Sequence, residues 1–413
     1  MFDYLSIDRP RKLVAFFNEP VILHCHHYNL FLQQTIEDPD WIDGVSILQT
    51  SAQEIFYSLL ANAFKTLGLQ TAAERLATAA HIFSFLGFGR LNFEVTEEGG
   101  EVELTHSHYA EGWLGKYGEQ VNRTKPIDHL AVGYAAAALD ATFAALGTYV
   151  AEETSCMAVT RQDHCIIQVT KAPVRRSLTP SPQMGKLIDQ PVPLPKGDTG
   201  VDYDAVNEAL WGLPLEGDVN GQIRAFDVLL TRMPANYYNR IQYRFLDELQ
   251  KVDPQLLEVG QALIRESGHV CVFHTFGNIM KSLEWETVVG PMLNTDTDWI
   301  HGAYAVASSL GWGRWQALEV VSDEFCRVAI DGNYEANYFL ASYPITAQPA
   351  CYFAQGAVPA IMNIVYNGRI QQKPVLDEAF YNRLFQRGGV FQGAEVKARE
   401  KGDPWCEFYA QRL

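Results

Sequence analysis

Leu86-Gly87-Phe88-Gly89-Arg90 in the first half of the chain returns as Leu310-Gly311-Trp312-Gly313-Arg314 in the second half. Further pairs follow at nearly the same offset: Tyr109 with Tyr334, Gln49-Thr50 with His274-Thr275, and Pro126, Ala131 and Gly133 with Pro349, Ala354 and Gly356. Matched motifs in one register predict two tandem copies of one structural unit. Where a reactive side chain is present in only one copy, maintenance of the fold alone does not explain it.

Composition predicts a globular protein with sizeable cores. The chain has 413 residues, 47% apolar and 20% charged, which suits about two or three domains. A formal net charge of -17 repels phosphate backbones, so nucleic acid is not an expected partner. Because the sequence contains no apolar run long enough to span a bilayer, and residues 1–20 lack a signal-peptide layout, no membrane partner is expected. The 7 cysteines are expected to be reduced thiols or metal ligands in a cytoplasmic protein.

A proline-rich stretch divides the chain. Prolines recur between Lys171 and Thr199, and since proline removes backbone donors and disfavours helix, an extended linker is expected there. The predicted organisation is a first unit at residues 1–170, a linker at 171–210 and a second, diverged unit at 211–413.

Local patterns predict mixed secondary structure. Apolar residues recur at helical spacing in 51–67 and 72–86, and the alanine-rich stretch 127–146 is apolar on all sides, as in a buried helix. Alternating runs around Glu97-Glu98-Gly99-Gly100 predict a β-hairpin at 92–108, and 165–169 alternates as a strand. The prediction is an α+β fold: two tandem copies of a small antiparallel sheet packed with helices, forming an intramolecular pseudo-dimer.

The first unit resembles a known family of domains. The resemblance rests on His106-Ser107, Ala110-Glu111, Pro126, Gly133-Tyr134-Ala135, Glu153-x-x-Cys156 and Cys165, with Leu48-Gln49-Thr50-Ser51-Ala52 and Thr66-Leu67-Gly68 upstream. These motifs are similar to the 4-vinyl-reductase-type domain and, more closely, to the aromatic-sensing region of phenol- and xylene-responsive transcriptional activators. The resemblance implies a buried pocket for a small aromatic molecule beside a zinc site. A Walker-type loop and a basic recognition helix are absent from the sequence, so the transcriptional output of those activators is not expected.

The same resemblance implies the ligands of a zinc site. Glu153, Cys156 and Cys165 match three ligand positions, and the fourth falls at Asp128, with His129 adjacent as the alternative. Such a set could close a tetrahedral shell, which would make the zinc structural. In the second unit the matching places hold Cys351, Glu395, Ala398 and Cys406, so only three ligands are expected there. Buried cysteines are also ordinary core residues, and that interpretation stays open.

Histidines of the first unit form a second candidate site, which comprises His24, His26, His27, His106 and His108. His106 and His108 would share one face of the predicted hairpin strand, and His24 and His26 would share a face if their segment is extended too. Converging imidazoles could hold a second transition metal such as iron or copper, polarise a phenol, or act as general acid and base. Histidines are also common as surface or core residues, so this alternative stays open.

The sequence leaves three functions open. The preferred one is binding of a small hydrophobic or aromatic ligand in a histidine-rich pocket of the first unit. The second is an enzyme that transforms the same molecule with a histidine-bound metal or a histidine acid/base pair. The third is an interaction module that forms a pseudo-dimer without a ligand, and a homodimer of the whole chain is also left open. Aromatic candidates for the pocket wall, which are equally candidates for the core, are Phe83, Phe85, Phe88, Trp113 and Tyr117.

Overall fold

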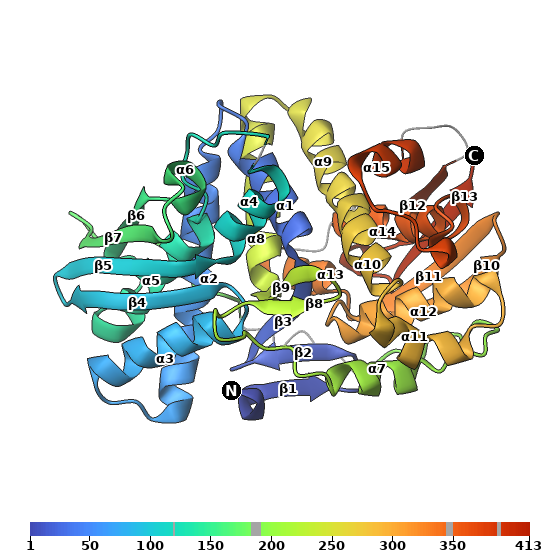
Figure 1. Cartoon of the computed structure of the whole chain (residues 1–413), viewed down its shortest axis with the longest axis horizontal. Coiled ribbons are helices and arrows are strands. Elements are labelled where there is room, and N and C mark those ends of the chain that lie inside the picture. Colours follow the sequence, from blue (N-terminus) through green and yellow to red (C-terminus); the bar gives the residue numbers. More distant parts are fainter. Residues whose placement is uncertain (119, 183–190, 344–349, 386–389) are drawn as a thin grey trace.

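A computed structural model describes residues 1–118, 120–182, 191–343, 350–385 and 390–413 (Figure 1). The α+β class predicted from the sequence is confirmed, because helices surround three antiparallel sheets. Two four-stranded sheets lie towards opposite ends of the molecule, and a five-stranded sheet lies between them (Figure 1). Among the described helices, none has the length and apolar character that crossing a bilayer requires.

The elements of the first half follow in chain order. They are η1 (Phe2–Tyr4), β1 (Leu5–Asp8), β2 (Leu13–Phe16), β3 (Glu19–Cys25), α1 (His26–Glu37), α2 (Gly44–Leu67), α3 (Ala72–Phe85), β4 (Gly89–Thr96), β5 (Gly99–Ser107), α4 (His108–Tyr117), α5 (His129–Phe143), β6 (Tyr149–Ser155), α6 (Met157–Thr160) and β7 (Cys165–Lys171).

The second half begins with a helix and a short hairpin. Its elements are α7 (Tyr203–Trp211), β8 (Ile223–Ala225), β9 (Val228–Pro234), α8 (Ala235–Val252), α9 (Leu256–Cys271), the π-helical η3 (Val272–Phe276), α10 (Gly277–Ile279), α11 (Leu283–Val288), η4 (Gly290–Met292), α12 (Asp296–Ser309), β10 (Arg314–Val321), β11 (Phe325–Asp331), α13 (Tyr334–Ser342), α14 (Tyr352–Met362), the π-helical η5 (Asn363–Asn367), η6 (Ile370–Gln372), α15 (Glu378–Phe385), β12 (Phe391–Lys397), η7 (Arg399–Lys401) and β13 (Cys406–Arg412).

The two four-stranded sheets are built on the same plan. Their strand orders are β4-β5-β7-β6 and β10-β11-β13-β12, and all neighbouring strands are antiparallel. The register shifts at the same place in both, between Glu153 and Ser155 in one sheet and between Glu395 and Lys397 in the other. A β-bulge redirects the side chains beside it, so the equivalent glutamates are redirected in the same way.

Glycines allow equivalent helix pairs to approach closely. A Cβ atom on Gly133 of α5 would lie 2.3 Å from the carbonyl oxygen of Gln49 on α2. In the second half, a Cβ atom on Gly356 of α14 would lie 1.9 Å from the carbonyl oxygen of Arg265 on α9. Neither pair of helices could keep this spacing with a larger residue, which explains why the sequence repeats these glycines.

The repeated turn motifs join the two halves. Gly87 and Gly311 both have a φ of 88°, a conformation that favours glycine. The carbonyl oxygen before each glycine accepts a hydrogen bond from a central strand that belongs to the other half. Leu310 O accepts from Leu23 N of β3 (3.0 Å), and Leu86 O accepts from Arg232 N of β9 (2.8 Å). Because β3 and β9 also pair with each other in the order β1-β2-β3-β9-β8, the central sheet is shared.

Most predicted elements are confirmed, with two differences. The hairpin strand ends at Ser107 instead of including His108, because the Ser107 hydroxyl accepts a hydrogen bond from Ala110 N and caps α4. The end of the predicted linker forms α7, whose first turn is capped by the Asp202 side chain. Residues 183–190 of that linker, and Pro349 of the repeated motif, lie outside the described residues.

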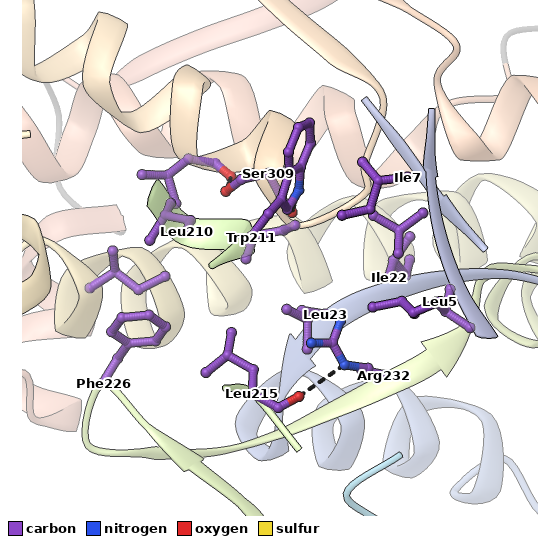
Figure 2. A pocket seen from close by; sticks show the side chains of 15 residues that line it. Leu5, Ile7, Ile22, Leu23, Leu210, Trp211, Leu215, Phe226, Arg232 and Ser309 are labelled. Atoms are coloured by element: carbon purple, nitrogen blue, oxygen red, sulfur yellow. Dashed lines mark hydrogen bonds between the residues drawn. The ribbon is translucent and has the colours of Figure 1, made fainter. Parts of the chain in front are cut away.

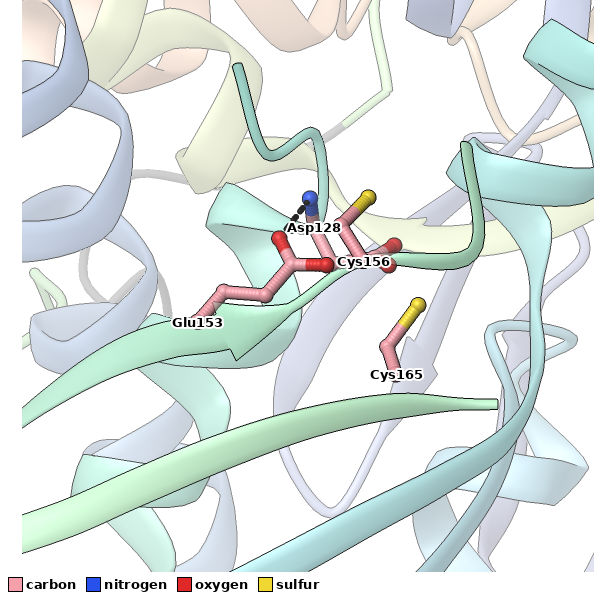
Figure 3. A group of neighbouring side chains, drawn as sticks. All are labelled: Asp128, Glu153, Cys156 and Cys165. Atoms are coloured by element: carbon pink, nitrogen blue, oxygen red, sulfur yellow. Dashed lines mark hydrogen bonds between the residues drawn. The ribbon is translucent and has the colours of Figure 1, made fainter. Parts of the chain in front are cut away.

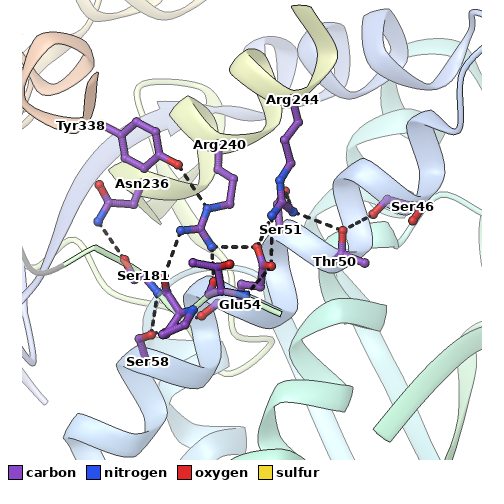
Figure 4. A network of polar contacts seen from close by, with 12 residues as sticks. Ser46, Thr50, Ser51, Glu54, Ser58, Ser181, Asn236, Arg240, Arg244 and Tyr338 are labelled. Carbon is purple, nitrogen blue, oxygen red and sulfur yellow. Dashed lines mark hydrogen bonds and ion pairs between the residues drawn. The ribbon is translucent and has the colours of Figure 1, made fainter. Parts of the chain in front are cut away.

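A buried charged network also connects the halves (Figure 4). Glu54 on α2 forms ion pairs with Arg240 and Arg244 on α8, at 2.7 and 2.8 Å. Thr179 N donates to the same carboxylate (2.8 Å), and Arg240 donates to Thr179 O (2.6 Å), so the chain that follows β7 is fixed over this contact. The network places opposite charges from the two halves against each other within the interface.

Candidate functional site

The first candidate metal centre, centre 1, gathers Asp128, Glu153, Cys156 and Cys165 (Figure 3). One potential ligand atom of each residue lies within 4.8 Å of those of the other three, and all four side chains are buried. Asp128 and Cys156 precede the first turns of α5 and α6, Cys165 begins β7, and Glu153 stands at the bulge of β6. Two helix starts, one strand start and a β-bulge thus direct two carboxyl groups and two thiols to one point.

Each carboxylate of centre 1 keeps one oxygen without a partner. Asp128 Oδ1 accepts from the Ser107 hydroxyl and Glu153 Oε2 accepts from Asp128 N (2.8 Å), but Asp128 Oδ2 and Glu153 Oε1 are buried and have no hydrogen bond. Within the described part of the chain, no lysine or arginine forms an ion pair with Asp128 or Glu153. A buried carboxylate that has no countercharge and one oxygen without a hydrogen bond is costly, and a bound cation would remove that cost.

The acidic groups of centre 1 also disfavour one another's charge. Burial raises the pKa of Asp128, and burial together with the charge of Asp128 raises the pKa of Glu153. The hydrogen bond between the thiols lowers the pKa of Cys156 and raises that of Cys165, so the pair loses a first proton more easily than a second. A metal ion would favour the deprotonated forms of all four groups.

The two alternatives for the fourth ligand point in different directions. Asp128 lies in centre 1, whereas His129 turns to α1 and α2, with Nε2 3.3 Å from Glu37 Oε2 and Nδ1 3.4 Å from the Gln49 side-chain nitrogen. Two thiolates and two carboxylates fit the ligand preferences and tetrahedral geometry of Zn²⁺. These four residues would hold the ion, and a shell closed by four protein ligands leaves no open position for catalysis.

The second half contains a corresponding group, centre 2, formed by Cys351, Glu395, Glu400 and Cys406. The two sulfur atoms are 3.6 Å apart, and the ligand atoms of all four residues again lie within 4.8 Å of one another. Glu395 Oε1 and Glu400 Oε2 are buried without hydrogen bonds. Burial, with the charges of Glu400 and Glu335, raises the pKa of Glu395 to about 9.

Centre 2 uses the same framework with one ligand displaced. Cys351 precedes α14 as Asp128 precedes α5, and Cys406 begins β13 as Cys165 begins β7. Ala398 occupies the place of Cys156 but lacks a ligand atom. Glu400, which lies two residues later in the turn η7, supplies the fourth group instead. A comparison of the two halves residue by residue does not find Glu400, because Glu400 is not at the position that corresponds to Cys156. The signal in the sequence is an acidic residue two positions after Ala398, where the thiol is missing.

Two of the five candidate histidines lie away from the others. His24 is stacked between the rings of Tyr28 (4.1 Å) and Trp312 (4.7 Å), and its Nδ1 is 3.4 Å from Cys271 Sγ, so it belongs to the core between the halves. His106 is partly exposed and its Nδ1 lies 2.8 Å from Glu111 Oε1. His106 and His108 point apart because the strand ends between them.

The other three candidates, His26, His27 and His108, form a histidine row together with His274 of the second half. The rings of His26 and His27 are 3.9 Å apart, and His27 is stacked at 3.9 Å on His274, which comes from η3. The His108 ring is 6.5 Å from that of His26. Among the described residues, neither group with metal-ligand geometry includes a histidine. His274 was missed by the sequence analysis, although its counterpart Gln49 marks it as present in only one copy.

His274 makes the stability of the fold dependent on pH. Burial, with the charges of Lys116 and His26, lowers its pKa to about 3. Below about pH 6.5, His274 is therefore protonated in the unfolded chain but stays neutral in the folded chain. The free energy of unfolding consequently falls as the pH falls towards 3. Between pH 7 and pH 5 this loss amounts to about 2 kcal/mol. We expect His274→Gln, which introduces the residue of the first half, to remove it in urea unfolding measured at both pH values.

The control for this substitution is His81→Gln, which removes an exposed histidine. It should change the unfolding free energy equally at pH 7 and pH 5. An unchanged pH dependence in His274→Gln would contradict the assignment.

A cleft of about 420 Å³ opens beside centre 1, between α1, α4 and residues 121–125. Its lining is Leu30, Phe31, Gln34, Glu37, Asp38, Trp113, Tyr117, Val121, Asn122, Arg123, Thr124 and Lys125. Trp113 and Tyr117 are the members of the predicted aromatic set that it includes, and Trp113 is itself a buried core residue, as are Phe83, Phe85 and Phe88, which do not line the cleft. None of the five candidate histidines is among its lining residues.

Polar contacts connect the floor of this cleft to centre 1. Arg123 forms a buried ion pair with Glu37 and donates to Pro126 O (2.9 Å). Burial disfavours the Glu37 carboxylate, but the His129 imidazole 3.3 Å away and the charge of Arg123 outweigh burial and lower the pKa of Glu37. Because His129 directly follows Asp128, the segment that lines the cleft is anchored at centre 1.

Comparison with known proteins finds similarity at the level of solved structures. No protein-family model and no curated protein matches the chain. Among solved structures, the crystal structure of the phenol-responsive sensory domain of the transcription activator PoxR with phenol is similar over 50% of this chain and 90% of that chain, with 11% sequence identity and a TM-score of 0.37.

Proposed function

We propose that this protein binds a small aromatic molecule in the cleft beside centre 1, and that zinc held at centres 1 and 2 stabilises its two halves. The observation that carries the proposal is the series of contacts from Asp128 and His129 through Glu37 to Arg123. Through these contacts, the order of the cleft wall depends on the order of centre 1. Zinc would supply structural cross-links and no chemistry at the ligand.

The composition of the cleft supports an aromatic ligand. Phe31, Trp113 and Tyr117 offer ring faces and edges for stacking, and a volume of about 420 Å³ lies within the usual range for small-molecule sites. Gln34 and Asn122 offer amide groups that could pair with a phenolic hydroxyl. The ligand class is thus a small ring that carries one polar substituent.

Trp113→Ala tests this assignment. Phenol, 4-methylphenol and catechol would be titrated into the zinc-loaded chain, with binding followed by calorimetry. We expect saturable binding of at least one compound and a loss of tenfold or more in Trp113→Ala, because a buried aromatic partner contributes more than about 1.4 kcal/mol.

Trp41→Ala serves as the control, since Trp41 is 59% exposed and lies outside the cleft. It should bind like the parent. Absence of saturable binding by every compound, or equal binding by Trp113→Ala, would remove the cleft as the site. Conversion of a ligand during the titration would instead favour the enzymatic alternative.

A further inference from the structure

We propose a second binding site, for a short-chain monocarboxylate, at Arg232 in a cavity between the two halves (Figure 2). The site is separate from the cleft and from both metal centres, and it does not rest on the function proposed above. Three observations support the proposal. The guanidinium of Arg232 forms no ion pair, an apolar cavity lies beside it, and the equivalent position of the first half holds a leucine.

The cavity lies against the central sheet and is lined almost entirely by apolar side chains. Ile7 and Leu23 come from its strands, Leu210 comes from α7, and Leu215 and Phe226 come from the connections around β8 (Figure 2). Its volume is about 30 Å³, which is room for roughly two or three water-sized groups. An apolar cavity of this size favours a small hydrocarbon group over water.

Arg232 is the charged residue in this lining. The residue is 7% exposed, and its Nε donates to Leu215 O at 3.0 Å. Its side chain makes no ion pair and no other hydrogen bond with the described residues, so both Nη nitrogens are left without protein acceptors. Neither Nη nitrogen is among the fully buried polar atoms that lack a partner, so both keep contact with solvent and could donate to an anion that replaces that water.

The guanidinium keeps its charge in this position. Burial lowers the pKa of Arg232 to about 10, while the negative charge of Glu216 acts in the opposite direction. Glu216 itself is exposed and forms no ion pair with Arg232 in the described structure. At neutral pH the cavity therefore has a positive group at its wall, and an anion is the ligand that complements it.

The backbone position equivalent to Arg232 in the first half holds an uncharged residue, Leu23. Leu23 and Arg232 lie opposite each other where β3 pairs with β9. Each donates its backbone N–H to the carbonyl oxygen that precedes the glycine of a repeated turn, Leu310 in one case and Leu86 in the other. The two residues thus occupy equivalent backbone positions. Leucine at one of them shows that the shared backbone arrangement does not require a charge there, and the Nε contact with Leu215 leaves both Nη nitrogens of Arg232 available to a ligand.

A monocarboxylate is the anion that these features fit best. The planar fork of an arginine matches the two oxygens of a carboxylate. One guanidinium balances one negative charge, whereas a sulfate or phosphate dianion would bring an uncompensated charge into the apolar cavity. A methyl or ethyl group beyond the carboxylate could fill the space beside Leu23 and Phe226, which a halide would leave empty. Acetate and propionate are therefore the expected size.

The test is calorimetric titration of the full chain with sodium acetate and sodium propionate, and with sodium chloride at matched ionic strength. We expect saturable binding of at least one carboxylate, with a dissociation constant on the order of 1 mM or tighter. Arg232→Leu, which introduces the residue of the equivalent position, should weaken that binding at least tenfold. Arg224→Leu is the matched control, because Arg224 lies on the neighbouring strand β8 with its side chain 56% exposed, and it should bind like the parent.

A second measurement covers the case in which Arg232→Leu fails to fold. Binding to the folded state alone raises the melting temperature, so propionate should stabilise the parent more than chloride does at equal concentration. Equal effects of propionate and chloride, or equal binding by the folded Arg232→Leu variant, would overturn the proposal. Trp113→Ala should bind propionate normally, which separates failure of this site from failure of the cleft.

Discussion

Cys165→Ser will lower the unfolding free energy of the zinc-loaded protein by more than about 4 kcal/mol, which is the range that marks loss of a structural metal. The reason is that three remaining ligands cannot close a tetrahedral shell, and Asp128 and Glu153 then stay buried without a countercharge. Because the segment that lines the cleft, residues 121–125, ends just before Asp128, aromatic ligands should also bind more weakly to this variant. Urea unfolding of the parent and the variant, each with and without a chelator, measures the effect.

Cys326→Ser is the matched control for this substitution. Cys326 is also a buried thiol, but it belongs to neither metal centre and lies beside Tyr304 instead. Its replacement should cost about 1–2 kcal/mol, as expected for a polar exchange in a core, and its chelator sensitivity should equal that of the parent. If the two serine variants lose equal stability and a chelator leaves the parent unchanged, centre 1 has no structural metal.

Glu54→Ala will lower the unfolding free energy by about 3–5 kcal/mol, because it leaves Arg240 as an unpaired buried charge at the interface. Glu54 also accepts from Thr179 N, so the variant loses the hydrogen bond that fixes the chain after β7. The effect should appear in urea unfolding as a lower midpoint with an unchanged slope, provided that the halves continue to unfold together.

The exposed pair of Lys171 and Glu98 provides the control for the buried network. Its nitrogen and oxygen are 2.7 Å apart, and the Glu98 side chain is 81% exposed. Glu98→Ala should therefore cost less than about 1 kcal/mol. A loss of similar size in Glu54→Ala would mean that the network contributes no more to stability than a surface ion pair does.

The repeated motifs carried most of what the sequence could predict. Each marks a point where the backbone or the packing tolerates few residues: Gly87 and Gly311 at positive φ, and Gly133 and Gly356 between crossing helices. Such local constraints appear directly in a sequence. The hairpin and the buried helix α5 follow in the same way from turn chemistry and from apolar character on all sides.

The central sheet could not be predicted in this way. The pairing that forms this sheet joins β3 to β9, which are more than two hundred residues apart. No local sequence feature of either strand indicates which strand it pairs with. The histidine row was missed for the same reason, since His274 reaches His27 only through that association of the halves. Glu400 was missed because a ligand can be supplied from a neighbouring turn when the matching position has lost its side chain.

Elemental analysis of the purified full chain will show whether the two buried groups, each of two cysteines and two carboxylates, hold zinc as we propose. We predict two zinc ions per chain, one of which is lost in Cys165→Ser and the other in Cys406→Ser, with both retained in Cys326→Ser. A chain that remains folded with no stoichiometric zinc after purification in zinc-containing buffer would contradict the account. So would a full complement of zinc in both Cys165→Ser and Cys406→Ser.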